Sequence, residues 1–188
     1  MSRIKVVATS PKLLLASLVA MLAAVALAVG SGASFTSHSA NPANTFSSGS
    51  LAQTNSSSGA VLTASKLKPG DSSTGTVTIT NSGDIAGTFS LTKSNLADTA
   101  GPNGGNLSGK LSVLIQDVTN AGSPTTVYSG TIGSMPAQSL GTFAAGAART
   151  YKFTVTFPDG GTPASTTTGD NAYRGSSLTV DYEWDSAS

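Results

Sequence analysis

The sequence has no cysteine and a single histidine, His38. Without cysteine no disulfide can form, so an exported form of the chain must be stabilised by its core, by ions or by neighbouring subunits. The zinc sites of metalloproteases need clustered ligands, typically His-Glu-x-x-His on a helix, and His38 stands alone in a polar segment. The motif Gly-x-Ser-x-Gly of serine hydrolases is also absent. We therefore predict that the protein is not an enzyme and has no catalytic residues, no metal and no cofactor.

Charge is scarce as well, since Asp, Glu, Lys and Arg make up only 10% of the chain. Three of the ten basic residues precede Ser34 and all nine acidic residues follow it, so the part from Ser34 onward has seven basic residues against nine acidic ones and a net charge of −2. Such a chain has no basic surface for phosphate, which excludes nucleic acid as a partner. The few charges also leave the edges of any β-sheet weakly protected against association.

The N-terminus has the layout of a signal peptide. Residues 13–29 form an apolar run, with Ser17 as its one polar residue, after three basic residues, Arg3, Lys5 and Lys12. Ser31 and Ala33 are small residues that suit cleavage between Ala33 and Ser34. We predict that residues 1–33 are removed by a signal peptidase and that no membrane contact remains afterwards. The alternative is an uncleaved transmembrane helix, because the apolar run reaches the lower limit of a membrane span.

After the N-terminal segment, alternation of apolar and polar residues predicts strands. In residues 76–80, Val77 and Ile79 share one face and three threonines the other. Residues 151–157 and 178–184 alternate in the same way, with aromatic inner faces. These patterns predict an all-β fold, an antiparallel β-sandwich of jelly-roll type over residues 61–188 with roughly eight strands. The predicted core residues are Phe89, Leu91, Val113, Ile115, Tyr151, Phe153, Val155, Leu178, Val180, Tyr182 and Trp184.

Residues 34–60 are polar, and we predict a flexible segment with a possible short strand at 44–51. Its large apolar side chains are isolated: Phe35, Phe46 and Leu51. A strand that is added to the edge of another subunit's sheet pairs exposed backbone groups and places alternate side chains in pockets. We therefore expect Phe35, Phe46 and Leu51 to form a donor segment. The alternatives are a disordered tail or an edge strand of the same subunit.

The acidic residues suggest no strong site. The last strand places three of them on one face, which alternation assigns to the solvated outer side: Asp181, Glu183 and Asp185. Four loop residues have oxygen ligands suited to calcium, without the twelve-residue loop of an EF-hand: Asp117, Asp159, Asp170 and Asn171. We leave calcium binding by these loops open.

Several stretches, taken in order, resemble the TasA/camelysin family, exported bacterial proteins of biofilm matrix fibres and surface filaments. Gly-Ala-Ser-Phe at 32–35 is similar to the end of the family's signal peptide. Residues 44–51 contain Phe-x-x-Gly-x-Leu, and residues 67–71 read Leu-Lys-Pro-Gly-Asp, followed by Asn-Ser-Gly at 81–83. Residues 171–178 before an aromatic strand resemble the family's C-terminal end. Together these stretches span nearly the whole chain after the signal peptide.

The resemblance implies a SipW-type signal peptidase and a jelly-roll sandwich that polymerises when each subunit donates an N-terminal strand to the next. It implies a secreted structural subunit of the extracellular matrix or cell surface, a homopolymer with a possible accessory matrix or anchor protein. Some members are described as metallopeptidases, but the zinc ligands for that activity are missing from this sequence. Two alternatives stay open: a monomeric adhesion or carbohydrate-binding module, and a secreted camelysin-like metallopeptidase.

Overall fold

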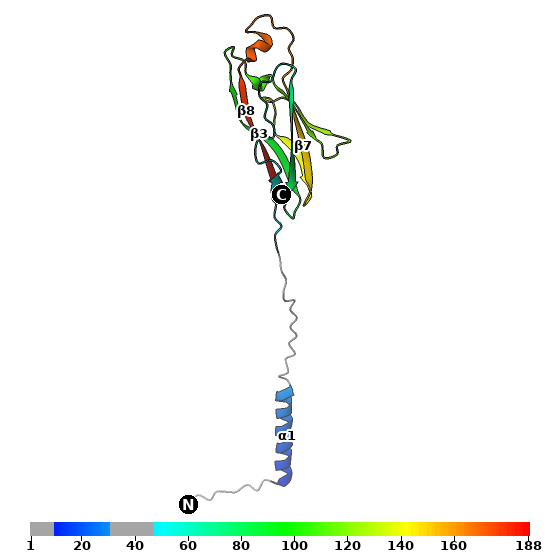
Figure 1. Ribbon diagram of the computed structural model, residues 1–188. Helices are drawn as coiled ribbons and strands as arrows, with labels where there is room; N and C mark the ends of the chain where they lie inside the picture. The colour runs from blue at the N-terminus through cyan, green and yellow to red at the C-terminus, as the bar shows by residue number, and fades with distance from the viewer. Residues whose placement is uncertain (1–9, 31–46) are drawn as a thin grey trace, which may run out of the picture. The chain divides into compact units, whose positions relative to one another are not determined.

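The computed structural model describes residues 10–30 and 47–188, which belong to two units, Met1–Phe46 and Ser47–Ser188 (Figure 1). The first unit contains the helix α1 (Pro11–Gly30). Pro11 opens α1 at the position where a missing N–H costs least, and Leu, Ala and Met, which are strong helix formers, fill it. Among the described residues, no helix is long and apolar enough to cross a membrane.

The second unit consists of two antiparallel sheets, with β3 and β8 in one layer and β7 in the other (Figure 1). The five-stranded sheet has the order β1 (Gln53–Asn55), β2 (Ser72–Asn81), β7 (Ala148–Thr156), β4 (Ser112–Asp117) and β5 (Thr125–Thr131). The three-stranded sheet has the order β6 (Gln138–Phe143), β3 (Gly87–Thr99) and β8 (Ser177–Ala187). The second unit also contains two short 3-10 helices, η1 (Leu107–Gly109) and η2 (Gly169–Tyr173). The predicted all-β sandwich is confirmed, while the finer jelly-roll type stays a prediction.

The alternation in β2 has the structural consequence that the sequence predicts. Val77 and Ile79 are buried, and the threonines that alternate with them point away from the core. On that outer face the hydroxyl groups of Thr78 and Thr150, from β2 and β7, lie 2.8 Å apart and form a hydrogen bond. The β-branched valine and isoleucine of β2 therefore pack in the core, while its threonines form hydroxyl hydrogen bonds on the outer face.

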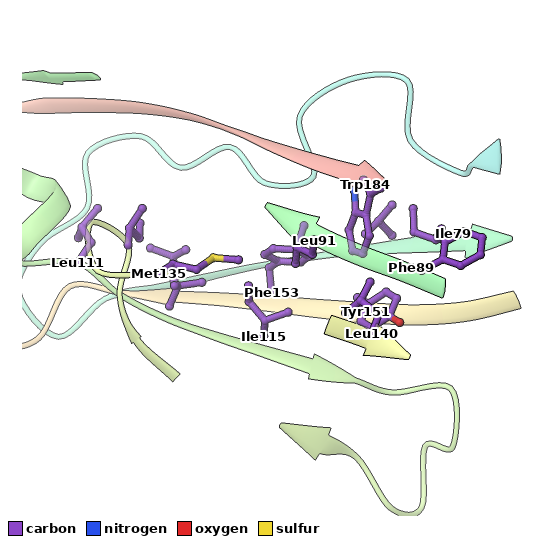
Figure 2. Packing of buried hydrophobic residues seen from close by; sticks show 14 of the residues in the cluster. Ile79, Phe89, Leu91, Leu111, Ile115, Met135, Leu140, Tyr151, Phe153 and Trp184 are labelled. Carbon is purple, nitrogen blue, oxygen red and sulfur yellow. The ribbon is translucent and has the colours of Figure 1, made fainter. Parts of the chain in front are cut away.

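The core is built from aromatic and aliphatic side chains of both sheets (Figure 2). Trp184 of β8 packs on Tyr151 of β7 with ring centroids 5.1 Å apart, and Phe89 stacks on Phe143 at 4.1 Å. Eight predicted core residues are buried: Phe89, Leu91, Val113, Ile115, Tyr151, Phe153, Val155 and Trp184. The other three, Leu178, Val180 and Tyr182, pack against the core but are only half-buried. All three lie on β8, which is an edge strand and borders an open groove.

Two motifs of the sequence form corners of the sandwich. The buried side chain of Asn81 donates hydrogen bonds to the carbonyl oxygens of Ile85 at 2.8 Å and Phe143 at 3.1 Å, which ties the end of β2 to β6. In the Lys-Pro-Gly-Asp turn, the N–H of Lys68 donates to the Asp71 carboxylate at 2.9 Å. Gly70 has a φ of 92°, which only glycine adopts easily. Both motifs are therefore structural.

The chain joins the sheet before residue 61. The compact unit spans Ser47–Ser188, and residues 53–55 form β1 on the edge of β2. Residues 47–51, in the possible short strand at 44–51, are not part of a strand. Pairing with a distant strand therefore overrides the weak local preferences of residues 47–55.

Candidate functional site: an apolar groove

A groove of about 1070 Å³ lies along one side of the second unit. One wall is formed by residues 59–69, the segment between β1 and β2 that we call the strap, and the other by η2 and β8. Core side chains line it between these walls: Leu111, Ile132, Val155 and Phe157. From β8, the half-buried side chains of Leu178, Val180 and Tyr182 also face it. Such a predominantly apolar groove is suited to apolar side chains of a partner.

The strap is held by side chains rather than by its backbone. Val61, Leu62 and Leu67 pack against the core. In contrast, residues 60–67 form no backbone–backbone hydrogen bond with any other described residue. Lys66 has a positive φ of 57°, which is uncommon for a residue other than glycine. A segment with few backbone hydrogen bonds opens at a lower free-energy cost than a paired strand.

The strap lies beside the part of β2 that has a paired strand on one side only. β2 pairs with β7 from Ser72 to Thr80, but β1 pairs only with residues 79–81. At Thr78 the carbonyl oxygen accepts the N–H of Ser56 at 3.0 Å, and the N–H donates to the Ser56 hydroxyl at 2.8 Å. Beyond this point residues 72–77, which we call the free edge of β2, have no strand beside them on that side within the described chain.

The direction of the backbone groups on the free edge follows from Thr78. In an antiparallel ladder, a residue directs its N–H and C=O to the same side, and the next residue directs them to the opposite side. Since Thr78 faces Ser56, Thr74 and Thr76 present their backbone groups to the same side. Neither has a hydrogen-bond partner there among the described residues. Both side chains are exposed on the outer face of β2.

A turn diverts the chain away from this edge. The Asn55 side-chain oxygen accepts the N–H of Ser57 at 2.8 Å, and the Ser57 hydroxyl donates to the carbonyl oxygen of Gly59 at 3.0 Å. Asn and Ser favour such local bonds over continued strand pairing. β1 therefore ends after three residues, and the strap crosses the inner face of β2 near Gly75.

One ion pair lies at the η2 end of the groove. Lys110 and Asp170 are 2.9 Å apart, and the second carboxylate oxygen of Asp170 accepts the N–H of Gly160 at 2.7 Å. The hydrogen bond from Lys110, together with that from Gly160, lowers the pKa of Asp170 below its usual value. The Lys110 ammonium lies 5.8 Å and 5.7 Å from the ring centroids of Phe157 and Tyr173. This carboxylate is thus engaged in holding η2 on the domain.

The side chain of Tyr182, which lines the groove, has a hydroxyl group that forms no hydrogen bond within the described chain. Its hydroxyl is buried and has no hydrogen-bond partner among the described residues. Burial raises the pKa of Tyr182 to about 12. The hydroxyl of Tyr151 and the indole N–H of Trp184 are buried without a described partner as well.

The residues that the sequence predicted for assembly are only partly described. Ala33, Ser34, Phe35 and Phe46 lie outside the described residues, as does His38. Leu51 is described and packs against the core of its own domain, where its side chain fills the space beside Gly87. In this chain Leu51 is therefore part of the domain rather than of a free segment.

The acidic residues do not converge. The side chains of Asp181 and Glu183 accept hydrogen bonds from Asn95 at 2.8 Å and from Ser94 on the exposed face of β3 and β8. Asp117 and Asp159 each accept a local N–H two residues on. Within residues 10–30 and 47–188, no group of three or more His, Cys, Asp or Glu is placed to hold a metal ion.

Neither the groove nor the strap was predictable from the sequence alone. Two signals were present: three large apolar residues in the stretch 59–69, and a glycine in the middle of a strand of β-branched residues. A glycine at such a position often marks the close approach of another backbone segment. Neither signal reveals which segment approaches.

Comparison with known proteins assigns a family. The family model described as camelysin metallo-endopeptidase matches residues 11–142, from α1 to β6. The match includes the strap and the free edge of β2 and stops before β7 and β8. No curated protein matches the chain.

Proposed function

The chain belongs to the camelysin metallo-endopeptidase family, and we propose that it is an exported, non-catalytic subunit of extracellular fibres or biofilm matrix. In this proposal each copy donates its N-terminal segment as a strand to a neighbouring copy. The observation that carries it is the apolar groove beside the free edge of β2, on a domain with few charges. Unpaired backbone groups and nearby apolar pockets are the two features that strand addition requires.

A peptidase role has little support in the residues themselves. The family description names a metal-dependent enzyme, and catalytic zinc is held by several His, Cys or carboxylate ligands around an open position. The chain has one histidine and no cysteine. Of the carboxylates near the groove, Asp170 is engaged by Lys110 and Gly160. The residues do not fit a zinc centre, so we derive no hydrolytic step.

The donor segment in this proposal runs from Ser34 to Phe46. Its 13 residues span at most about 45 Å when extended, which is longer than the whole of β2. Phe35 and Phe46 supply the apolar side chains, and the segment contains no Asp, Glu, Lys or Arg. Cleavage after Ala33 by a signal peptidase would free the segment only after export, so assembly inside the cell would be prevented.

The test compares two chains, one beginning at Ser34 and one at Ser47. The second retains the complete compact unit, including β1 and Leu51. We expect the chain from Ser34 to form fibres in negative-stain micrographs, and the chain from Ser47 to fold and elute as a monomer. Phe46→Asp should weaken assembly without changing thermal unfolding. Equal fibre formation by both chains would exclude donation by this segment.

Two further results separate the alternatives. A monomeric chain from Ser34 that binds glycans would support the adhesion or carbohydrate-binding module. Proteolysis of a protein substrate that a chelator abolishes would support the peptidase.

A further inference from the structure

We infer that the donor segment of a second copy adds to the free edge of β2, at Thr74 and Thr76, and takes the place of the strap. This inference rests on the proposed function and names the acceptor strand and the segment that must move. The added strand would continue the line of β1 along β2. It would supply partners to the backbone groups of Thr74 and Thr76, which have none among the described residues.

The free edge of β2 is less protected than the edge formed by β8. β8 has three acidic residues on its outer face, Asp181, Glu183 and Asp185. Charged side chains on an edge strand oppose the addition of another strand. The six residues of the free edge of β2 include no charged side chain. Charge therefore favours β2 over β8 as the acceptor.

The strap separates the free edge from the groove. It forms one wall of the groove and crosses the inner face of β2 at Gly75. Val61 and Leu62 occupy apolar space that the inward side chains of an added strand would need. Because residues 60–67 have no backbone hydrogen bonds to other described residues, an added strand would gain hydrogen bonds that the strap does not make.

The direction of β1 carries the preceding residues away from the free edge, so a segment of the same copy would have to reverse its course to reach Thr74, whereas a segment of a second copy would not. β1 runs antiparallel to β2, so the residues before Gln53 lie beyond the end of β2 at Asn81. The carbonyl oxygen of Ala52 accepts the N–H of Ser82 at 2.9 Å, and the N–H of Ser50 donates a hydrogen bond to the Asp84 carboxylate. The chain therefore enters the domain at the end of β2 that is opposite to Thr74, about 23 Å away at the usual rise of a strand.

The experiment places a charge on the acceptor edge and the same charge on a strand that is already paired. In chains beginning at Ser34, we compare Thr76→Lys with Thr154→Lys. Thr154 lies on the outer face of β7, which has β2 on one side and β4 on the other. We expect loss of fibre growth in Thr76→Lys and normal growth in Thr154→Lys, with both variants folded by circular dichroism. Thr74→Lys should repeat the loss and replaces Thr76→Lys if that variant is unfolded.

The outcomes distinguish the two proposals. If the unmodified chain from Ser34 forms fibres and Thr76→Lys and Thr74→Lys form them equally well, the acceptor assignment is wrong and the proposed function stands. If the unmodified chain stays monomeric, because its own segment covers the edge or because it does not assemble, both proposals fail.

Discussion

A Cβ atom on Gly75 would lie 1.9 Å from the carbonyl oxygen of Val61. No side chain can be accommodated at that distance, so the strap can follow its path across β2 only because residue 75 is glycine. The backbone of Gly75 has no positive φ, and β2 continues regularly on both sides of it. Space for the strap, rather than backbone freedom, therefore accounts for this glycine.

Gly75→Thr should displace the strap while leaving β2 able to pair with β7. We expect a loss of about 1–3 kcal/mol in the free energy of unfolding, as for overpacked sites. Trypsin should cut faster after Lys66, which lies in the strap. Gly122→Thr is the matched control, because the nearest atom to a Cβ there is 3.6 Å away. Equal rates of cleavage in both variants would mean that the strap does not depend on Gly75.

Trp184→Ala should destabilise the domain strongly. The indole contacts Tyr151 at 5.1 Å and Phe153 at 6.3 Å between ring centroids, and its removal leaves a cavity between the sheets. We expect a loss of about 3–5 kcal/mol in urea unfolding. Thr179→Ala, on the exposed face of the same strand, should change stability little. A water-exposed indole by fluorescence of the native protein would contradict this packing.

Stability should fall in alkali between about pH 10 and pH 12. Burial raises the pKa of both Tyr151 and Tyr182 to about 12, from 10 in an exposed tyrosine. The folded state then keeps protons that the unfolded state has lost, so the stabilisation present below pH 10 disappears as the pH approaches 12. Tyr182→Phe should reduce this dependence in pH-dependent urea unfolding. An unchanged dependence would show that the Tyr182 hydroxyl ionises normally in the folded domain.

Acid should weaken the attachment of η2. Hydrogen bonds from Lys110 and Gly160 lower the pKa of Asp170 from its ordinary 3.8, so the unfolded state binds this proton first. The corresponding stability is present above about pH 4 and is lost as the pH falls through the lowered pKa. Lys110→Met should reduce stability at neutral pH and flatten its decline in acid. Lys152→Met, which removes a lysine without an ion pair to any described residue, should leave the acid profile unchanged.

Protein recovered from the surface of producing cells should begin at Ser34. Ser31 and Ala33 provide small residues before the cut, behind the apolar run 13–29, which lies within α1. N-terminal sequencing provides the measurement. A chain that still begins at Met1 would support the alternative of a retained segment.

The sequence by itself determined the layers of this protein. Alternation in 76–80, 151–157 and 178–184 has the period of a strand with one buried face, and these stretches lie in strands of the sandwich except for Phe157, which follows the end of β7. The turn at 68–71 is also a local feature, since Pro and Gly restrict the backbone there. These are properties of neighbouring residues, which is why they could be predicted without a structure.

The tertiary structure alone decided where the candidate site lies. β1, the strap and the ion pair of Lys110 with Asp170 all depend on contacts between residues far apart in the chain. Residues 53–55 have no strong strand pattern, and they pair because β2 offers them backbone groups. Which edge is then left free depends on the order of the strands in the sheet, and alternation within one strand carries no information about its neighbours.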